Sequence, residues 1–130
     1  MRLGLAVALL ILTGAAARAD AIVTVEAGRD VVNMAAEDIL GVVLQDDGNS
    51  PRVVVTLTEA GITPLATFTM AHVKEEVVLK VCGQVVSRPT LWAPVLDGVF
   101  AIQGDGKAKA ERLAEVLKTR DCGVSPDPGA

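Results

Sequence analysis

The chain has one histidine and two cysteines, the side chains whose chemistry would be most informative. His72 is the only side chain that ordinarily titrates near neutrality, so a Ser-His-Asp or Cys-His arrangement would have to include it. It falls near the C-terminal end of an expected helix, where a histidine more often completes the helix end than performs catalysis. The alternative is a small thiol-dependent or ligand-binding enzyme centred on Cys82 and His72.

The two cysteines, Cys82 and Cys122, lie forty positions apart and do not form a CxxC pair. In an oxidising compartment an even pair first indicates a disulfide. Such a bridge would join the end of a central strand to the segment after the last helix. Closing a loop of this length contributes about 3–4 kcal/mol in the chain-entropy treatment. Two free thiols are the alternative.

A cluster of acidic and amide residues, Asp46, Asp47 and Asn49, could suggest calcium. An EF-hand loop needs a glutamate at its twelfth position, and counting from Asp46 that position is Leu57. The cluster also contains glycine and proline, so turn formation explains it without a metal.

The segment 104–107 (GDGK) could suggest a phosphate-binding loop. The required glycine five residues before Gly106 is Ala101, and Ala108 follows the lysine where Ser or Thr is needed. The sequence therefore indicates no enzyme, no metal site and no cofactor.

The first nineteen residues have the pattern of a secretory signal peptide. Arg2 precedes an uncharged apolar stretch, residues 3–13, and residues 17–19 (Ala-Arg-Ala) offer the small residues that a signal peptidase reads. We expect cleavage between Ala19 and Asp20, a periplasmic location, and no membrane insertion of the mature chain. An uncleaved anchor is disfavoured because the apolar run is shorter than the roughly 20 residues that span a bilayer.

The charge and the aromatic content narrow the possible partners. Without the signal peptide, ten basic and sixteen acidic residues remain, a net charge of −6. An acidic surface repels nucleic acid and anionic lipid headgroups. The aromatic residues are one Trp and two Phe, too few for a stacking platform.

The first half of the mature chain predicts a hairpin. Residues 22–25 form a short apolar run typical of an edge strand. Residues 39–45 and 52–58 are two further strands, and the turn residues 46–51 between them predict an antiparallel pair.

A helix is expected after the second of these strands, with Thr58 as its N-cap. Pro64 interrupts the helical spacing, so we expect either a kink or a restart with Thr63 as a second cap. The helix should end in solvent at residues 74–76.

Residues 77–82 predict another strand, with a two-residue turn at 83–84 and a return strand beginning at 85–87. Two prolines then break the ladder, so residues 88–98 should form an irregular crossing. Residues 99–103 are a short strand.

The last helix is expected at about 107–119, capped by Asp105, with the apolar stripe Ala110, Leu113, Ala114 and Leu117. Residues 121–130 are expected to be a disordered tail. The predicted fold class is α+β: a single antiparallel sheet with two helices packed on one face.

The region from Val53 to Thr119 resembles the head subdomain of the first periplasmic domain of the protein-export membrane proteins SecD and SecDF. The matching segments follow one another in order: VVVTLTEAG (53–61), Leu65-Ala66 with Thr69, VVLKVCGQVVSRP (77–89), APVLDG (93–98), AIQG (101–104), and Ala110 with LAEVL (113–117). The resemblance predicts a head-like domain at 53–120, preceded by a strand and hairpin extension at 20–52.

This resemblance implies the fold and a capacity to contact extended polypeptide. The chain departs from the family pattern at Cys82, where an Asp usually precedes the glycine, and at Lys74, where a Gly is common. It has no membrane-embedded ionisable residues, which proton-coupled transport requires. We therefore expect a non-catalytic binding module that contacts exported polypeptides or an envelope protein.

The candidate partner surface consists of residues around the crossing: Ser87, Arg88, Pro89, Trp92 and Pro94. Trp and Arg are enriched at binding hot spots. Trp92 could instead fold down over the edge of the sheet, and the whole domain could be structural, without a ligand of its own.

Overall fold

The structure is a computed structural model that describes residues 21–46, 48 and 50–123. Seven strands, two α-helices and one short 3-10 helix follow one another in this part of the chain. Their bounds are β1 Ala21–Ala27, β2 Asp30–Ala35, η2 Ala36–Asp38, β3 Ile39–Gln45, β4 Arg52–Leu57, α2 Glu59–Ala71, β5 Val78–Val81, β6 Gln84–Ser87, β7 Val99–Gln103 and α3 Lys107–Thr119.

The strands form two antiparallel sheets rather than the single sheet expected from the sequence. One sheet has the order β2-β1-β5-β6 and the other has the order β3-β4-β7. After α2 the chain does not return to the sheet that holds β4, because β5 pairs with β1 instead. The α+β class is confirmed, and the number of sheets is corrected to two.

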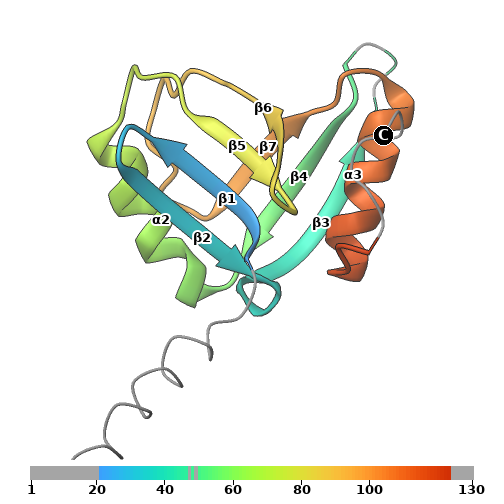
Figure 1. Cartoon of the computed structure of the whole chain (residues 1–130), viewed down its shortest axis with the longest axis horizontal. Coiled ribbons are helices and arrows are strands. Elements are labelled where there is room, and N and C mark those ends of the chain that lie inside the picture. Colours follow the sequence, from blue (N-terminus) through green and yellow to red (C-terminus); the bar gives the residue numbers. More distant parts are fainter. Residues whose placement is uncertain (1–20, 47, 49, 124–130) are drawn as a thin grey trace, which may run out of the picture.

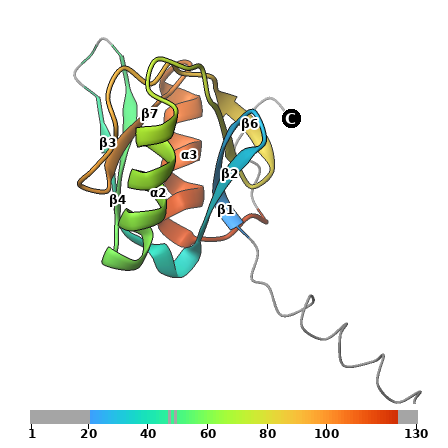
Figure 2. The ribbon, with the colours of Figure 1, turned by 90° about the vertical axis from the view of Figure 1, so that its left-hand side faces the viewer.

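The helices lie at opposite ends of the molecule when it is viewed as in Figure 1. The turned view shows both helices on one side of the β3-β4-β7 sheet, with the other sheet beyond them (Figure 2). Both helices contact β4. The expectation of two helices on one face therefore holds for the β3-β4-β7 sheet.

A single apolar core joins both sheets and both helices. On β4 the alternating residues Val53, Val55 and Leu57 are buried, as the period of a strand with one covered face requires. On α3 the predicted stripe of Ala110, Leu113, Ala114 and Leu117 is buried, together with Val116. The apolar stripe predicted for α3 therefore faces the core.

The β3–β4 hairpin is confirmed, with Gln45 opposite Arg52. In the connection the Gly48 N–H donates to Asp46 Oδ1 at 3.0 Å, a side-chain turn that explains an acidic residue at this point without a metal.

The β1 strand is central rather than at an edge, because it pairs with β2 on one side and β5 on the other. The neighbouring strand β2 lies at the edge of the sheet, and its residues alternate between exposed and buried. The sequence pattern did not predict a strand in this region.

The α2 helix is continuous from Glu59 to Ala71 and passes through Pro64, so the alternative of a restart with Thr63 as a second cap is wrong. Proline has no N–H, so the carbonyl of Ala60, four residues before Pro64, has no helical partner. Both residues are exposed, so water can reach this carbonyl. Thr58 occupies the N-cap position, as predicted, but its hydroxyl makes no capping bond.

The α3 helix begins at Lys107 with Gly106 as its N-cap, so the expected cap at Asp105 is wrong. Gly106 has φ +100°, a conformation that glycine adopts without steric cost and that aspartate does not. None of the helices in the described part of the chain has the length and hydrophobicity needed to span a bilayer. The expected signal peptide lies outside the described residues, as do residues 124–130 of the tail.

Candidate binding surface at the crossing segment

Residues 88–98 form the crossing segment, which leads from β6 to β7 without regular structure. Backbone hydrogen bonds tie its first half to the chain just before β5. The Val77 N–H donates to the Pro89 carbonyl at 2.9 Å, and the Leu91 N–H donates to the Glu75 carbonyl at 2.9 Å. The crossing segment is therefore anchored although it belongs to no sheet.

The second half of the crossing segment is held by one buried side chain, Thr69 of α2. Its hydroxyl accepts the Val95 N–H at 2.9 Å and lies 2.9 Å from the Leu65 carbonyl, to which it donates. Thr69 is 1% exposed and is the single buried polar side chain in the described part of the chain. One hydroxyl thus links α2 to the crossing segment and leaves neither partner unsatisfied.

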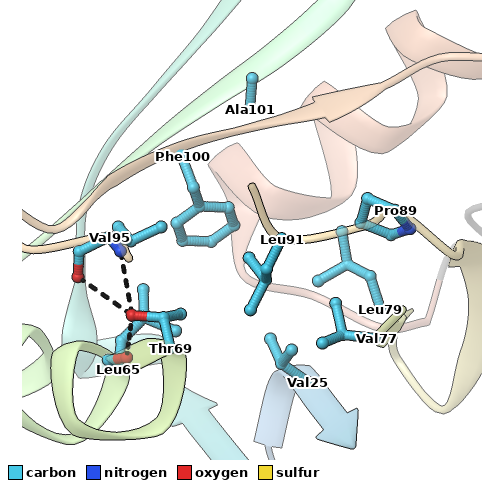
Figure 3. A pocket seen from close by; sticks show the side chains of 10 residues that line it. All are labelled: Val25, Leu65, Thr69, Val77, Leu79, Pro89, Leu91, Val95, Phe100 and Ala101. Carbon is cyan, nitrogen blue, oxygen red and sulfur yellow. Dashed lines mark hydrogen bonds between the residues drawn. The ribbon is translucent and has the colours of Figure 1, made fainter. Parts of the chain in front are cut away.

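A pocket of about 260 Å³ lies between the two sheets, walled by α2 and the crossing segment (Figure 3). Its lining is aliphatic and aromatic apart from the Thr69 hydroxyl, which is already hydrogen-bonded. Pro89, Leu91 and Val95 bring the crossing segment into this lining. The pocket therefore offers dispersion contacts and no free charge, which suits an apolar side chain of a ligand.

The structure places the five predicted surface residues along one continuous stretch of chain. Arg88 and Pro89 are exposed, while Ser87 and Pro94 are half-buried. Trp92 is 76% exposed, so its ring does not fold over the sheet edge. It directly follows Leu91, which lines the pocket.

The predicted disulfide is present. Cys82 and Cys122 are bonded, with their Cα atoms 5.6 Å apart, so the end of β5 is joined to the segment that follows α3. The alternative of a thiol-dependent enzyme needs a free thiolate at Cys82, and in this structure that sulfur is bonded to its partner.

The turn between β5 and β6 consists of Cys82 and Gly83, one residue earlier than predicted, because Val81 pairs with Gln84. Both turn residues have positive φ, +52° and +81°, as a two-residue hairpin of the primed type requires. Aspartate tolerates this conformation better than most residues, which explains physically the Asp-Gly of the family pattern.

Lys74 is the second departure from the family pattern and has the same physical basis. Its φ is +75°, in the left-handed region where glycine is at no disadvantage. The common glycine of the family pattern thus corresponds to a real backbone requirement, which this chain meets with a strained lysine.

His72 is the C-cap residue of α2, and its N–H donates to the Thr69 carbonyl at 3.2 Å. The ring packs on Phe68, and its two nitrogens lie 2.7 Å from Asp30 and 2.8 Å from Glu75. The hydrogen bond to Glu75 raises the pKa of His72, the one to Asp30 adds to this, and desolvation opposes both.

The side chains on this surface are therefore presented by an α+β domain in which two antiparallel sheets share a core with two helices. Residues 13–120 match the sequence family described as SecDF, P1 head subdomain. Because this match spans more than half of the chain, the chain belongs to that family. Comparison with curated proteins gave no match.

Two solved structures are similar in fold. The first, described as "Structure and function of a membrane component SecDF that enhances protein export", has a TM-score of 0.56 and 20% identity, over 65% of this chain and 39% of that chain. The second, "Crystal structure of SecDF in Super-membrane-facing form", has a TM-score of 0.57 and 21% identity, over 65% of this chain and 12% of that chain. The chain thus spans less than half the length of either SecDF chain.

Sequence reasoning missed two features of this surface, the pocket and the bond from Thr69 to Val95. Thr69 did contribute to the family resemblance, as the threonine that follows Leu65-Ala66. Its role was hidden because Val95 is 26 residues away and only the folded chain brings the two together.

Proposed function

We propose that this chain is a non-catalytic periplasmic binding module that holds a short apolar segment of an exported polypeptide. The segment would lie along the crossing segment, with one apolar side chain in the pocket and the backbone passing Trp92. The observation that carries the proposal is an apolar pocket lined by Leu91, the residue that precedes the exposed Trp92 on an anchored, irregular segment.

The chemistry of the surface favours an extended polypeptide, rather than a small polar molecule, as the ligand. The pocket lining offers no free charged group, and Thr69, its polar side chain, is already engaged. A half-buried apolar contact of this kind is tolerant of sequence, since aliphatic side chains of several shapes can fill it. Such tolerance is what a module for many different exported chains needs.

The anchored backbone supports the proposal in a second way. Because Pro89, Leu91 and Val95 are held by hydrogen bonds to elements of the fold, the surface is ordered before a ligand arrives. A preorganised surface loses less conformational entropy on binding, which favours affinity from a small contact area.

The proposal is tested by placing a photo-crosslinking amino acid at position 92 in intact cells that export labelled protein. The matched control carries it at Val31, which is 49% exposed on β2, away from the crossing segment. We expect transient crosslinks to newly exported chains from position 92 and background levels from position 31. Equal labelling from both positions, or none from position 92, would contradict the proposal and leave a domain without an independent ligand.

A second measurement uses Trp92 as a probe, since it is the only tryptophan in the chain. Addition of a permanently unfolded polypeptide that contains no tryptophan should shift its emission to the blue and protect it from acrylamide quenching. The variant Arg88→Glu reports whether the neighbouring charge contributes. Unchanged quenching at saturating polypeptide would count against contact at Trp92.

A further inference from the structure

The ring of His72 connects the start of β2, which is distant in sequence, to residues close to His72 at the C-terminal end of α2. Nε2 lies 2.7 Å from Asp30 Oδ2, at the start of β2, and Nδ1 lies 2.8 Å from Glu75 Oε1, in the segment after α2. Phe68 of α2 packs against the ring, with the two ring centres 4.8 Å apart. The histidine side chain is only 13% exposed, whereas Asp30 and Glu75 are 63% and 54% exposed.

Both short contacts require a proton on each ring nitrogen. A carboxylate only accepts hydrogen bonds, and a neutral imidazole carries one N–H and one lone pair. When the ring loses a proton, one of the two carboxylates must therefore face a lone pair and its contact must break. The geometry at His72 is that of the doubly protonated, positively charged ring.

We propose that His72 is a pH-sensitive clasp that fastens the tip of the β1–β2 hairpin to the C-terminal end of α2. The tip is residues 28–30, which include the β1–β2 turn and the first residue of β2. A shallow groove between β2 and α2, with Asp30 and Phe68 in its lining, lies beside the clasp. Opening the clasp frees the hairpin tip along this groove, while β1 stays paired with β5.

The direction of the pH dependence follows from the charges that face the ring. The hydrogen bonds to Glu75 and Asp30, together with the negative charges of these carboxylates, raise the pKa of His72 above the ordinary 6.5. Desolvation lowers this pKa by a smaller amount. A group whose pKa is raised on folding stabilises the folded state fully below its unfolded value and loses that contribution as pH rises through the folded value. The clasp is therefore closed below pH 6.5 and opens as the pH rises through the raised pKa of His72.

The test is local, because half-exposed carboxylates are screened by solvent and the effect on global stability is small. Hydrogen exchange, corrected for the intrinsic rate at each pH, is measured over residues 28–34 and, as an internal reference, over β4. We expect protection of residues 28–34 to fall relative to β4 as pH rises from 5.5 to 8.5. His72→Gln, which does not titrate, should remove this difference.

NMR titration of the His72 ring provides a measurement on the unaltered chain. The pKa should lie above 6.5 and move down towards it in both Asp30→Asn and Glu75→Gln, while Glu76→Gln, which alters the neighbouring carboxylate, should leave it nearly unchanged. A wild-type pKa at or below 6.5 would overturn the proposal even if the glutamine variant failed to fold. So would protection of residues 28–34 that follows β4 at every pH.

Discussion

Three non-glycine residues in the described part of the chain, Lys74, Cys82 and Arg120, have positive φ, which glycine would adopt at lower cost. Lys74 and Cys82 both have positive φ, and in both places the family pattern has a residue better suited to it. For Cys82 the structure supplies a compensation, since its sulfur is bonded to Cys122. The Lys74 N–H donates to the Leu91 carbonyl, but glycine would keep this backbone hydrogen bond, so the strain of the lysine conformation is expected to lower stability.

Lys74→Gly should raise the free energy of unfolding by about 0.5–1 kcal/mol, because removing a left-handed non-glycine conformation outweighs the added chain entropy. Thermal denaturation followed by circular dichroism measures this. Lys118→Gly is the matched control, since Lys118 lies in the last turn of α3 and glycine there should cost about 1 kcal/mol or less. A lower melting temperature for Lys74→Gly would show that φ at this position is not the limiting strain.

Thr69→Val should lower the free energy of unfolding by about 1–3 kcal/mol, because the part-buried Val95 N–H loses its acceptor while the shape of the buried side chain is kept. Thr119 gives the control, as its hydroxyl also bonds the carbonyl four residues earlier but lies at the exposed end of α3. Thr119→Val should change stability by less than about 0.5 kcal/mol. Equal effects of the two substitutions in urea denaturation would mean that the bond to the crossing segment contributes nothing.

At the scale of the elements, those formed by local signals were predicted well. The sequence placed β3, β7 and α3 at their observed bounds, because turn residues, β-branched runs and a helical stripe define them within a few residues. The central position of β1 was not predicted, since its partner β5 lies more than fifty residues later. No local pattern specifies which of several apolar strands will be paired.

The glycine before β7 is an example of an element boundary set by packing. Gly98 has φ +75°, and a Cβ there would lie 2.5 Å from Cγ1 of Ile62 on α2. Gly98→Ala should therefore lower the free energy of unfolding by about 2–4 kcal/mol, from backbone strain and overpacking together. Gly28→Ala is the control, because φ there is +60° and no atom lies within 4 Å of the added Cβ. In this variant only backbone strain should lower the free energy of unfolding.

The two contributions at Gly98 separate in a double variant. Ile62→Ala removes the Cγ1 atom that would collide, so the effect of Gly98→Ala measured in the Ile62→Ala background should be smaller than in the wild type. Equal effects in both backgrounds, measured by urea denaturation, would show that the contact with Ile62 is not the cause.

At the scale of the whole molecule, the disulfide connects the two halves of the structure. It joins the β5–β6 turn of one sheet to the end of α3, the helix that packs against β3 and β4 of the other. Cysteine spacing predicted the pairing correctly, because two cysteines allow only one intramolecular bridge. The spacing could not predict that the strands form two sheets, and that the bridge connects one sheet to the helix packed against the other.

The double variant Cys82→Ser/Cys122→Ser should have a free energy of unfolding lower by about 3–4 kcal/mol, the loop-closure contribution of a forty-residue separation. A reducing agent should lower the melting temperature of the wild type and leave the variant unaffected. Alkylation of the native protein, read by mass spectrometry, should show no free thiol before reduction. A melting temperature insensitive to reductant would indicate that the bridge constrains little.

The pairing of β1 with β5 also bears on how quickly the molecule acquires its structure. Val23 lies opposite Val81, and two of the three intervening strands, β3 and β4, belong to the other sheet, so the first sheet cannot be completed until much of the chain is in place. Proteins dominated by such remote partners typically reach their native state in milliseconds to seconds rather than microseconds. A newly made chain of this kind therefore stays unstructured for a comparatively long interval, during which it remains fit for threading through a narrow opening.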